Sequence, residues 1–379
     1  MKPQWIDEAI KKTEDKIRKT ASRAGDALIY YTTSEGKYVP HDSGNASWWT
    51  NGFWPGILWL LYRDSKDESI RAIAESAGKK LDEVLYGYDQ VDHDAGFMWK
   101  LSAVTEYQLT GNETARKKGL LAAALLASRY TGNGEYIRAW NHEGREGIAI
   151  IDCMMNLPIL YWASEEIKDN RYTWFAKKHA DTVIDKFMHP DGSVRHQVRF
   201  SSETGEVIEY PLGQGYSPDS AWSRGNAWAL YGFALSYKLT GERRYYDAAK
   251  RVANFFIAAL PEDYVPFADF KAPAEENINK DSSAASCAAS GLLLLASCAD
   301  EFEKDIYQTA GEKIVYSLYT NYTDWSGEQE ALLLKANVSY HYKPISGDYK
   351  TLIYADYFFY EALKRLEGKE GLFELMGRI

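Results

Sequence analysis

The chain is poor in the residues that build disulfide frameworks and metal centres. Its three cysteines, Cys153, Cys287 and Cys298, are odd in number and show no CxxC spacing, which argues against a disulfide framework or a zinc site. Seven histidines are scattered along the chain, with no pair four residues apart on one predicted helix, so metal catalysis has little support. We therefore expect reduced, buried thiols and neither a metal nor another cofactor.

The chain also lacks a long apolar run and a surplus of positive charge. The longest apolar stretch, about residues 284–299, contains Ser and Cys and is too short to cross a bilayer. The net charge of −10 argues against binding to nucleic acid or to anionic membranes, since both require a basic surface. Residues 1–5 lead directly into a charged amphipathic helix without an apolar signal segment. We expect a cytoplasmic protein, whose oligomeric state the sequence does not indicate.

A sixfold repeat organises the sequence, and no Pro-, Gly- or Ser-rich linker interrupts it. In each repeat an apolar helix pattern rich in small residues is followed by a short turn and a charged helix pattern. The turns at residues 109–113 and 239–243 are near copies, Leu-Thr-Gly followed by polar residues, as expected between helices. With the amphipathic residues 5–23 counted as one of the charged helices, the pattern gives twelve helices in one domain, residues 1–379. The apolar helices are predicted to begin near Asn51, Asp94, Asp152, Gly225, Ala284 and Leu352.

The two kinds of helix predict a double ring. Residues 226–236 and 286–296 are apolar nearly all round, as helices covered on every side should be, whereas residues 243–256 keep a charged face. An α-solenoid would alternate similarly, but without the polar and aromatic clusters that precede most of the apolar helices. The pattern predicts an all-α fold, an (α/α)6 barrel of six inner and six outer helices. Its active site is expected where the inner helices begin.

Two carboxylates stand at that rim, Asp94 and Asp152, on successive inner helices. One such Asp is often a helix N-cap, but two of them, with His93 beside one and Ile150 and Ile151 before the other, favour a catalytic pair. A helix N-terminus favours the ionised carboxylate, whereas a second carboxylate and apolar walls raise one pKa. Such a pair supplies acid and base for a carbohydrate reaction, with inverting glycoside hydrolysis as the default.

Six sequence strings carry a more specific signal. They lie at residues 49–59, 92–98, 150–158, 221–234, 281–285 and 356–363. In this order they resemble strings of the unsaturated glucuronyl hydrolases, glycoside hydrolase family 88, over essentially the whole chain. The resemblance implies an (α/α)6 barrel that removes the unsaturated uronic acid from lyase-generated oligosaccharides. It implies hydration of the C4=C5 enol ether, with Asp152 as general acid and base and with Asp94 holding substrate hydroxyls and keeping the proton on Asp152.

The predicted binding residues come from the resemblance and from position. The resemblance matches His196, Gln214 and Arg224 to polar groups near the substrate, a small anionic oligosaccharide. It also matches Trp49, Trp222 and Trp228 to stacking tryptophans, although Trp228 lies within an apolar helix and equally fits the core. Position adds His93, beside Asp94, and Tyr342, before the last inner helix. Residues 189–220, rich in β-branched residues with two turn signals, are predicted to form a hairpin over the rim.

Other functions stay open at this point. An unsaturated rhamnogalacturonyl hydrolase shares the fold and chemistry but differs in the subsite for the leaving sugar. A non-catalytic sugar-binding barrel would not need both Asp94 and Asp152, and an inverting glycosidase would cleave saturated substrates. Lys343 and Lys350, in the late loop, are candidates for contacting a sulfate group on the substrate.

Overall fold

The six predicted inner helices are present in the computed structural model, which describes residues 3–40, 46–341 and 351–378. Each is buried over most of its length because its sequence is apolar nearly all round. They are α2 (Phe53–Ser65), the π-helix η2 (Gly96–Val104) continued by α5 (Thr105–Thr110), the 3-10 helix η3 (Ile151–Met155) with α7 (Pro158–Ile167), α9 (Ser223–Thr240), α11 (Ser282–Cys298) and α13 (Ile353–Leu366).

The inner helices form a closed ring. Contacts run from α2 to η2, α7, α9, α11 and α13, and α13 returns to α2. The (α/α)6 barrel predicted from the repeat is therefore confirmed. The ring encloses aromatic side chains: Phe358 contacts Phe53, Trp228 and Phe373. Trp228 thus fills the interior, which accounts for its place in an apolar helix.

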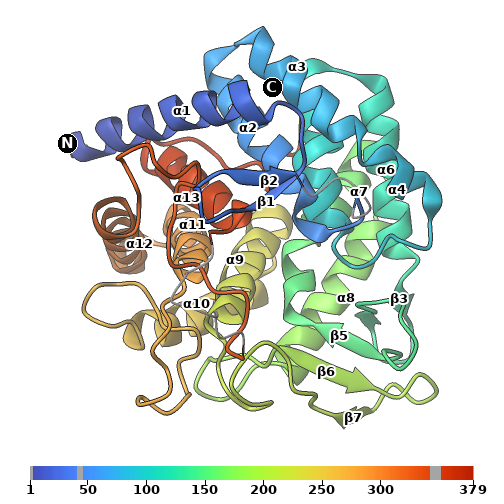
Figure 1. The fold of residues 1–379 in the computed structure, drawn as a ribbon. Helices are drawn as coiled ribbons and strands as arrows, with labels where there is room; N and C mark the ends of the chain where they lie inside the picture. The colour runs from blue at the N-terminus through green and yellow to red at the C-terminus, as the bar shows by residue number, and fades with distance from the viewer. Residues whose placement is uncertain (1–2, 41–45, 342–350, 379) are drawn as a thin grey trace.

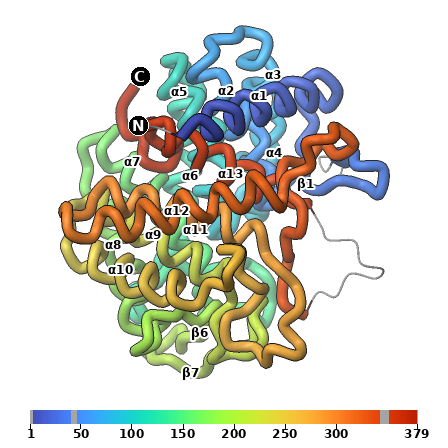
Figure 2. The backbone as a smooth tube through the Cα atoms, turned by 90° about the vertical axis from the view of Figure 1, so that its left-hand side faces the viewer, coloured from blue at the N-terminus to red at the C-terminus, as the bar shows by residue number. Residues whose placement is uncertain are grey.

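The outer helices cover the ring; α1 precedes the first inner helix in sequence, and each of the others follows an inner helix (Figure 1). Their polar faces remain exposed while every third or fourth residue packs inward, and α12 runs along the outside of α11 (Figure 2). Gly111 and Gly241 adopt left-handed φ angles of 76° and 71° in the two matching turns, as predicted. The outer helices are α1 (Gln4–Ala24), α3 (Glu68–Lys79), α6 (Glu113–Ala127), α8 (Arg171–Lys186), α10 (Arg243–Ala258) and α12 (Glu301–Asn321); α4 (Asp82–Gly87) and the 3-10 helix η1 (Trp49–Gly52) are short additions.

Short strands decorate the connections between helices. The hairpin predicted within residues 189–220 is present as β6 (Gln197–Phe200) and β7 (Val207–Glu209). The sequence did not predict that β5 (Ile148–Ile150) pairs with β6 to give a three-stranded sheet (Figure 1). This pairing matters for the site, because β5 leads directly into η3 and Asp152. The remaining strands are β1 (Ile29–Thr32), β2 (Tyr38–Pro40), β3 (Tyr130–Thr131) and β4 (Tyr136–Ile137).

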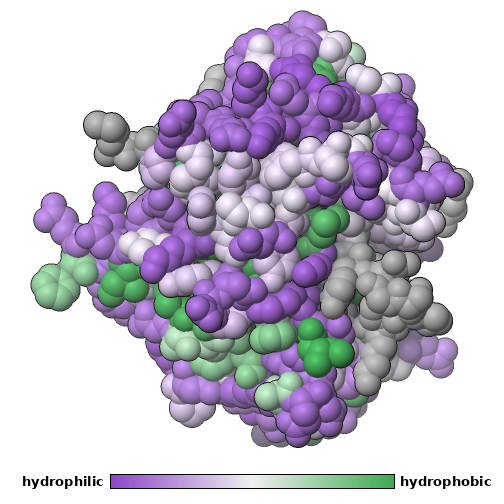
Figure 3. Space-filling view, turned by 60° about the vertical axis from the view of Figure 1, so that its left-hand side comes forward, coloured by the Kyte–Doolittle hydropathy of each residue, from purple (hydrophilic) through white to green (hydrophobic). Residues whose placement is uncertain are grey.

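The surface agrees with the acidic, polar composition. The face in Figure 3 is mostly hydrophilic, and its apolar residues form only small groups. Within the described ranges, no helix combines the length and the apolar character that a membrane span requires.

Candidate active site

A pocket of about 770 Å³ lies where the inner helices begin. Its wall includes six of the ten residues predicted for the site: Trp49, His93, Asp94, Asp152, Gln214 and Arg224. His196 lies directly behind Asp152, while Trp222 and Trp228 are buried away from the pocket wall. Tyr342, Lys343 and Lys350 lie outside the described residues. The structure therefore gathers both carboxylates, which are 58 residues apart in sequence, in one cavity.

The β5–β6 pairing places Asp152 against His196. The Ile151 amide donates to the His196 carbonyl at 3.0 Å, and His196 Nε2 lies 3.3 Å from Asp152 Oδ2. The Gln214 amide donates to His196 Nδ1 at 3.0 Å, so the proton of the neutral ring belongs on Nε2, which faces the carboxylate. Burial acts to raise the pKa of Asp152, but the contact with His196, aided by the more distant Arg224, outweighs burial and lowers the pKa below its usual value. Asp152 is thus ionised in the free site.

Gly213 is what lets the backbone approach His196 so closely. A Cβ at this position would lie 1.9 Å from His196 Nδ1, so Gly213→Ala must displace the imidazole or the Gln214 amide. We expect kcat/KM to fall by about tenfold to a hundredfold, because small misplacements of catalytic groups cost this much. Steady-state kinetics would measure the loss. Gly132→Ala, where the added Cβ meets nothing within 4 Å, serves as the control; equal activity of both variants would contradict a role for this approach.

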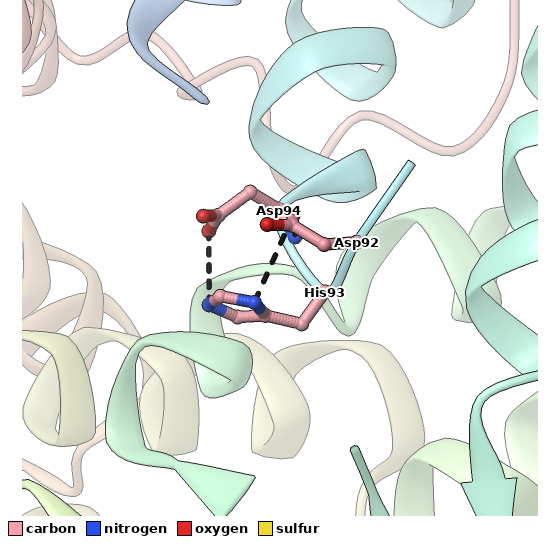
Figure 4. A group of neighbouring side chains, drawn as sticks. All are labelled: Asp92, His93 and Asp94. Carbon is pink, nitrogen blue, oxygen red and sulfur yellow. Dashed lines mark hydrogen bonds and ion pairs between the residues drawn. The ribbon is translucent and has the colours of Figure 1, made fainter. Parts of the chain in front are cut away.

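Asp94 has the opposite environment, shown in Figure 4. His93 Nδ1 donates to the Ala139 carbonyl at 2.9 Å, so its Nε2 is the unprotonated nitrogen, and this atom lies 3.4 Å from Asp94 Oδ1. Burial, followed by the charges of Asp92 and Asp152, raises the pKa of Asp94 well above its usual value, while burial lowers the pKa of His93. A protonated Asp94 beside a neutral His93 fits both shifts.

The two histidines therefore present different ring nitrogens to the two carboxylates. His196 presents an N–H to Asp152, whereas His93 presents a lone pair to Asp94. In the ligand-free site burial and the neighbouring carboxylates raise the pKa of Asp94, whereas that of Asp152 is lowered; that Asp94 keeps the proton on Asp152 in the substrate complex stays a prediction. The backbone partner of each imidazole decides which nitrogen faces the carboxylate, and no sequence pattern reveals these partners.

Asp92, His93 and Asp94 also have the spacing of a cation site, with ligand atoms within 4.8 Å of one another (Figure 4). However, Asp92 Oδ1 already accepts the Asp94 amide at 2.9 Å, and Asp94 Oδ1 accepts a hydrogen bond from Asn156 at 3.2 Å. We therefore assign these groups to proton placement rather than to a metal.

Arg224 is more constrained than expected for a free carboxylate-binding group. Its Nη1 donates to Asp281 Oδ2 at 3.2 Å and to the Asn337 carbonyl, and its Nη2 donates to the Val338 carbonyl at 2.6 Å. The guanidinium stacks on the Trp222 ring, 4.5 Å from its centroid. Of its nitrogens only Nε has no hydrogen-bond partner among the described residues. Arg224 thus presents a largely neutralised charge at the pocket wall.

Of the three predicted stacking tryptophans, only Trp49 lines the pocket. It is partly exposed and packs against Tyr354 at 4.8 Å between ring centroids. Neither Trp222 nor Trp228 exposes the ring face that the predicted stacking role requires. Trp222 is 2% exposed and packs against His196, and Trp228 is fully buried and packs against Trp49. Both support the residues that face the pocket.

Several site residues were missed by the sequence analysis. Trp140, Tyr354 and Asp92 line the pocket, and Asn156 connects the two carboxylate-bearing segments. Asp92 and Asn156 lie within the strings that carried the resemblance, so proximity to Asp94 and Asp152 was an available signal. Trp140 lies in an irregular segment, and no feature of the sequence indicated that it would line the pocket.

A ring of inner helices with one buried and one partly buried carboxylate, and with polar and aromatic groups at one rim, is the architecture of an enzyme acting on carbohydrates. The model of Glycosyl Hydrolase Family 88 matches residues 29–251. The unsaturated glucuronyl hydrolase of Bacillus sp. (strain GL1) is 38% identical over 363 residues, 93% of this chain and 95% of the relative. The chain belongs to glycosyl hydrolase family 88 and is a glycoside hydrolase.

Solved structures agree with this assignment. The unsaturated glucuronyl hydrolase from Bacillus sp. GL1, described as responsible for the degradation of glycosaminoglycan, superposes with a TM-score of 0.91 at 34% identity, covering 98% of this chain and all of the other. A variant of the unsaturated glucuronyl hydrolase from Streptococcus agalactiae, complexed with dGlcA-GalNAc6S, gives a TM-score of 0.82 at 28% identity, with 97% and 93% covered.

Proposed function

We propose that this enzyme removes the 4,5-unsaturated glucuronic acid from the non-reducing end of glycosaminoglycan-type oligosaccharides. Family membership and the relatives described above support this substrate class. The observation that carries the proposal for this chain is that Asp94 and Asp152 line one pocket, where the pKa of Asp94 is raised by burial and neighbouring carboxylates and that of Asp152 is lowered. Such a pair holds one proton ready for exchange with a substrate.

The reaction begins with proton transfer to C4 of the enol ether. This step makes C5 electron-poor and oxocarbenium-like, and water then adds to C5 while a carboxylate takes its proton. The resulting hemiketal rearranges, which opens the ring and expels the remaining sugar. Asp152 is the group we assign to both transfers, since a single positioned carboxyl group gives one proton and takes one back.

Substrate binding changes the proton balance of the free site. The substrate brings its own carboxylate, and a like charge nearby raises the pKa of a carboxyl group. For Asp152 to act as the acid, this charge must raise the pKa of Asp152 more than that of Asp94, and we propose that Asp152 takes up its proton in the complex in this way, although its pKa is low in the free site. His93 and Asp94, together with His196, Gln214 and Arg224, hold the sugar, and Trp49 offers a ring face to it.

The alternatives receive less support. The relatives described above are glucuronyl rather than rhamnogalacturonyl hydrolases, and both candidate catalytic carboxylates are retained, unlike in a pure binding protein.

A contact of sulfate with Lys343 and Lys350 stays a prediction, as do one catalytic domain over residues 1–379 and a cytoplasmic location. A continuous hydrophobic cluster from Ile6 to Leu375 supports the single domain.

The test follows the ultraviolet absorbance of the conjugated double bond. The wild-type enzyme should abolish this absorbance in unsaturated chondroitin or hyaluronan disaccharides and leave saturated disaccharides intact. Cleavage of saturated disaccharides would instead identify an ordinary glycosidase, and binding without turnover would identify a sugar-binding protein.

A further inference from the structure

Asn156 is the one side chain among the described residues that bonds to both carboxylate-bearing segments. Its Nδ2 donates to Asp94 Oδ1 and to the backbone carbonyl of Asp152, each at 3.2 Å. Its Oδ1 accepts the Phe97 amide at 2.7 Å. The side chain is fully buried, and Gly96 lies so close that a Cβ there would be 2.4 Å from Asn156 Cα. η2 and η3 are thus joined through one amide group.

Asn226, at the start of the next inner helix, shows what part of this arrangement is structural. Its Nδ2 donates to the Trp222 carbonyl four residues earlier at 2.8 Å, and its Oδ1 accepts the Val194 amide at 3.1 Å. Asn156 repeats both contacts, since Asp152 also precedes it by four residues. Asn226 is equally buried, but it does not bond to a carboxylate in the described part of the chain. The second N–H of Asn156, toward Asp94, is therefore not required for joining the helices.

We propose that Asn156 is a positioning residue that fixes the orientation of the Asp94 carboxyl group relative to Asp152, so that Oδ2 of Asp94 is left for the substrate. Oδ1 is engaged by Asn156 and faces His93. Among the described residues no hydrogen bond reaches Oδ2. This inference rests on the proposed function, because it assigns Asn156 to the arrangement of the same carboxylate pair.

The charge around Asp94 gives the inference a measurable consequence. The titratable and charged groups near Asp94 come from three segments. Its own turn contributes Asp92 and His93, η3 contributes Asp152 and Cys153, and the segment after α6 contributes Arg129. The Asn156 hydrogen bond favours ionised Asp94, since it acts to lower a pKa that burial and the neighbouring carboxylates raise. Loss of this donor should therefore raise the pKa of Asp94 further. The proton shared by the two carboxylates would then be lost at a higher pH.

The experiment compares Asn156→Asp and Asn156→Ala with the matched control Asn226→Asp, on unsaturated disaccharide over a range of pH. Each Asp variant keeps the acceptor oxygen and loses the donor, but only Asn156→Asp places a carboxyl group against Asp94. We expect kcat/KM of Asn156→Asp to fall by about tenfold to a hundredfold, the usual effect of losing a hydrogen bond to a charged group. The alkaline limb of its pH profile should move up by about one unit, and that of Asn156→Ala should move in the same direction.

The control separates positioning from stability. Asn226→Asp should lose thermal stability as Asn156→Asp does, with its pH profile unchanged. If the Asn156 variants keep the wild-type profile and lose activity only as Asn226→Asp does, Asn156 is merely structural and the inference is wrong. Inactivity of the wild type on unsaturated disaccharides would instead reject the proposed function. If Asn156→Asp does not fold, the shift in the alkaline limb of the Asn156→Ala pH profile tests the inference instead.

Discussion

Asp152→Asn is expected to lose about a thousandfold or more in kcat on unsaturated disaccharides while still binding them. An amide neither gives a proton to C4 nor takes one from water, and positioned acid–base groups typically contribute about 10² to 10⁴ in rate. The substitution is isosteric and leaves an amide oxygen that can accept a hydrogen bond from His196. In the wild-type structure His196 Nε2 lies 3.3 Å from the carboxylate. Ultraviolet absorbance would measure turnover, and calorimetric titration would measure binding of the intact substrate.

The matched variant is Asp94→Asn, which resembles the protonated state that the free site already favours. We expect a smaller loss of kcat from this variant, accompanied by a rise in KM, because Asp94 holds the sugar rather than carrying the proton to it. If Asp152→Asn retains substantial turnover and Asp94→Asn does not, the two carboxylates exchange roles. The raised pKa of Asp94 would then mark the proton donor itself.

The barrel and the carboxylate pair were predictable because the sequence repeats. The inner helices are apolar nearly all round, and all but the last are followed by an amphipathic helix. The 3.6-residue pattern and the turns at Gly111 and Gly241 therefore predict the double ring. Asp94 and Asp152 begin successive inner helices, and a closed ring brings such positions to one rim. Local pattern and global fold agree here, as expected for a sequence that encodes one structure.

The allocation of the proton was not predictable, because it depends on contacts between segments far apart in sequence. His196 reaches Asp152 through the pairing of β5 with β6, and its tautomer is set by the Gln214 amide. Strand pairing has no local signature when one strand has only three residues. The ring of Trp228 was similarly ambiguous, since an aromatic residue near a helix start fits either a pocket wall or a core.

Asp281→Ala is expected to lower the free energy of unfolding by about 3–5 kcal/mol, the usual cost of leaving a buried charge without its partner. Asp281 is fully buried. It accepts the Ser283 and Ala284 amides as the N-cap of α11, accepts the Asn337 amide, and lies 3.2 Å from Arg224 Nη1. Its removal therefore leaves three amides without their acceptor and the Arg224 guanidinium without its carboxylate partner. Denaturant unfolding would measure the change.

Asp300→Ala separates the cap from the buried charge. Asp300 is an exposed N-cap of α12 that accepts the Glu303 amide, and losing such a cap costs about 1 kcal/mol. An equal loss in both variants would mean that the Arg224 pair adds nothing. A larger loss from Asp281→Ala, together with a raised KM, would show that Asp281 holds Arg224 at the pocket wall. Arg224 would then contribute to binding mainly through its fixed position, since its charge is already paired with Asp281 before substrate arrives.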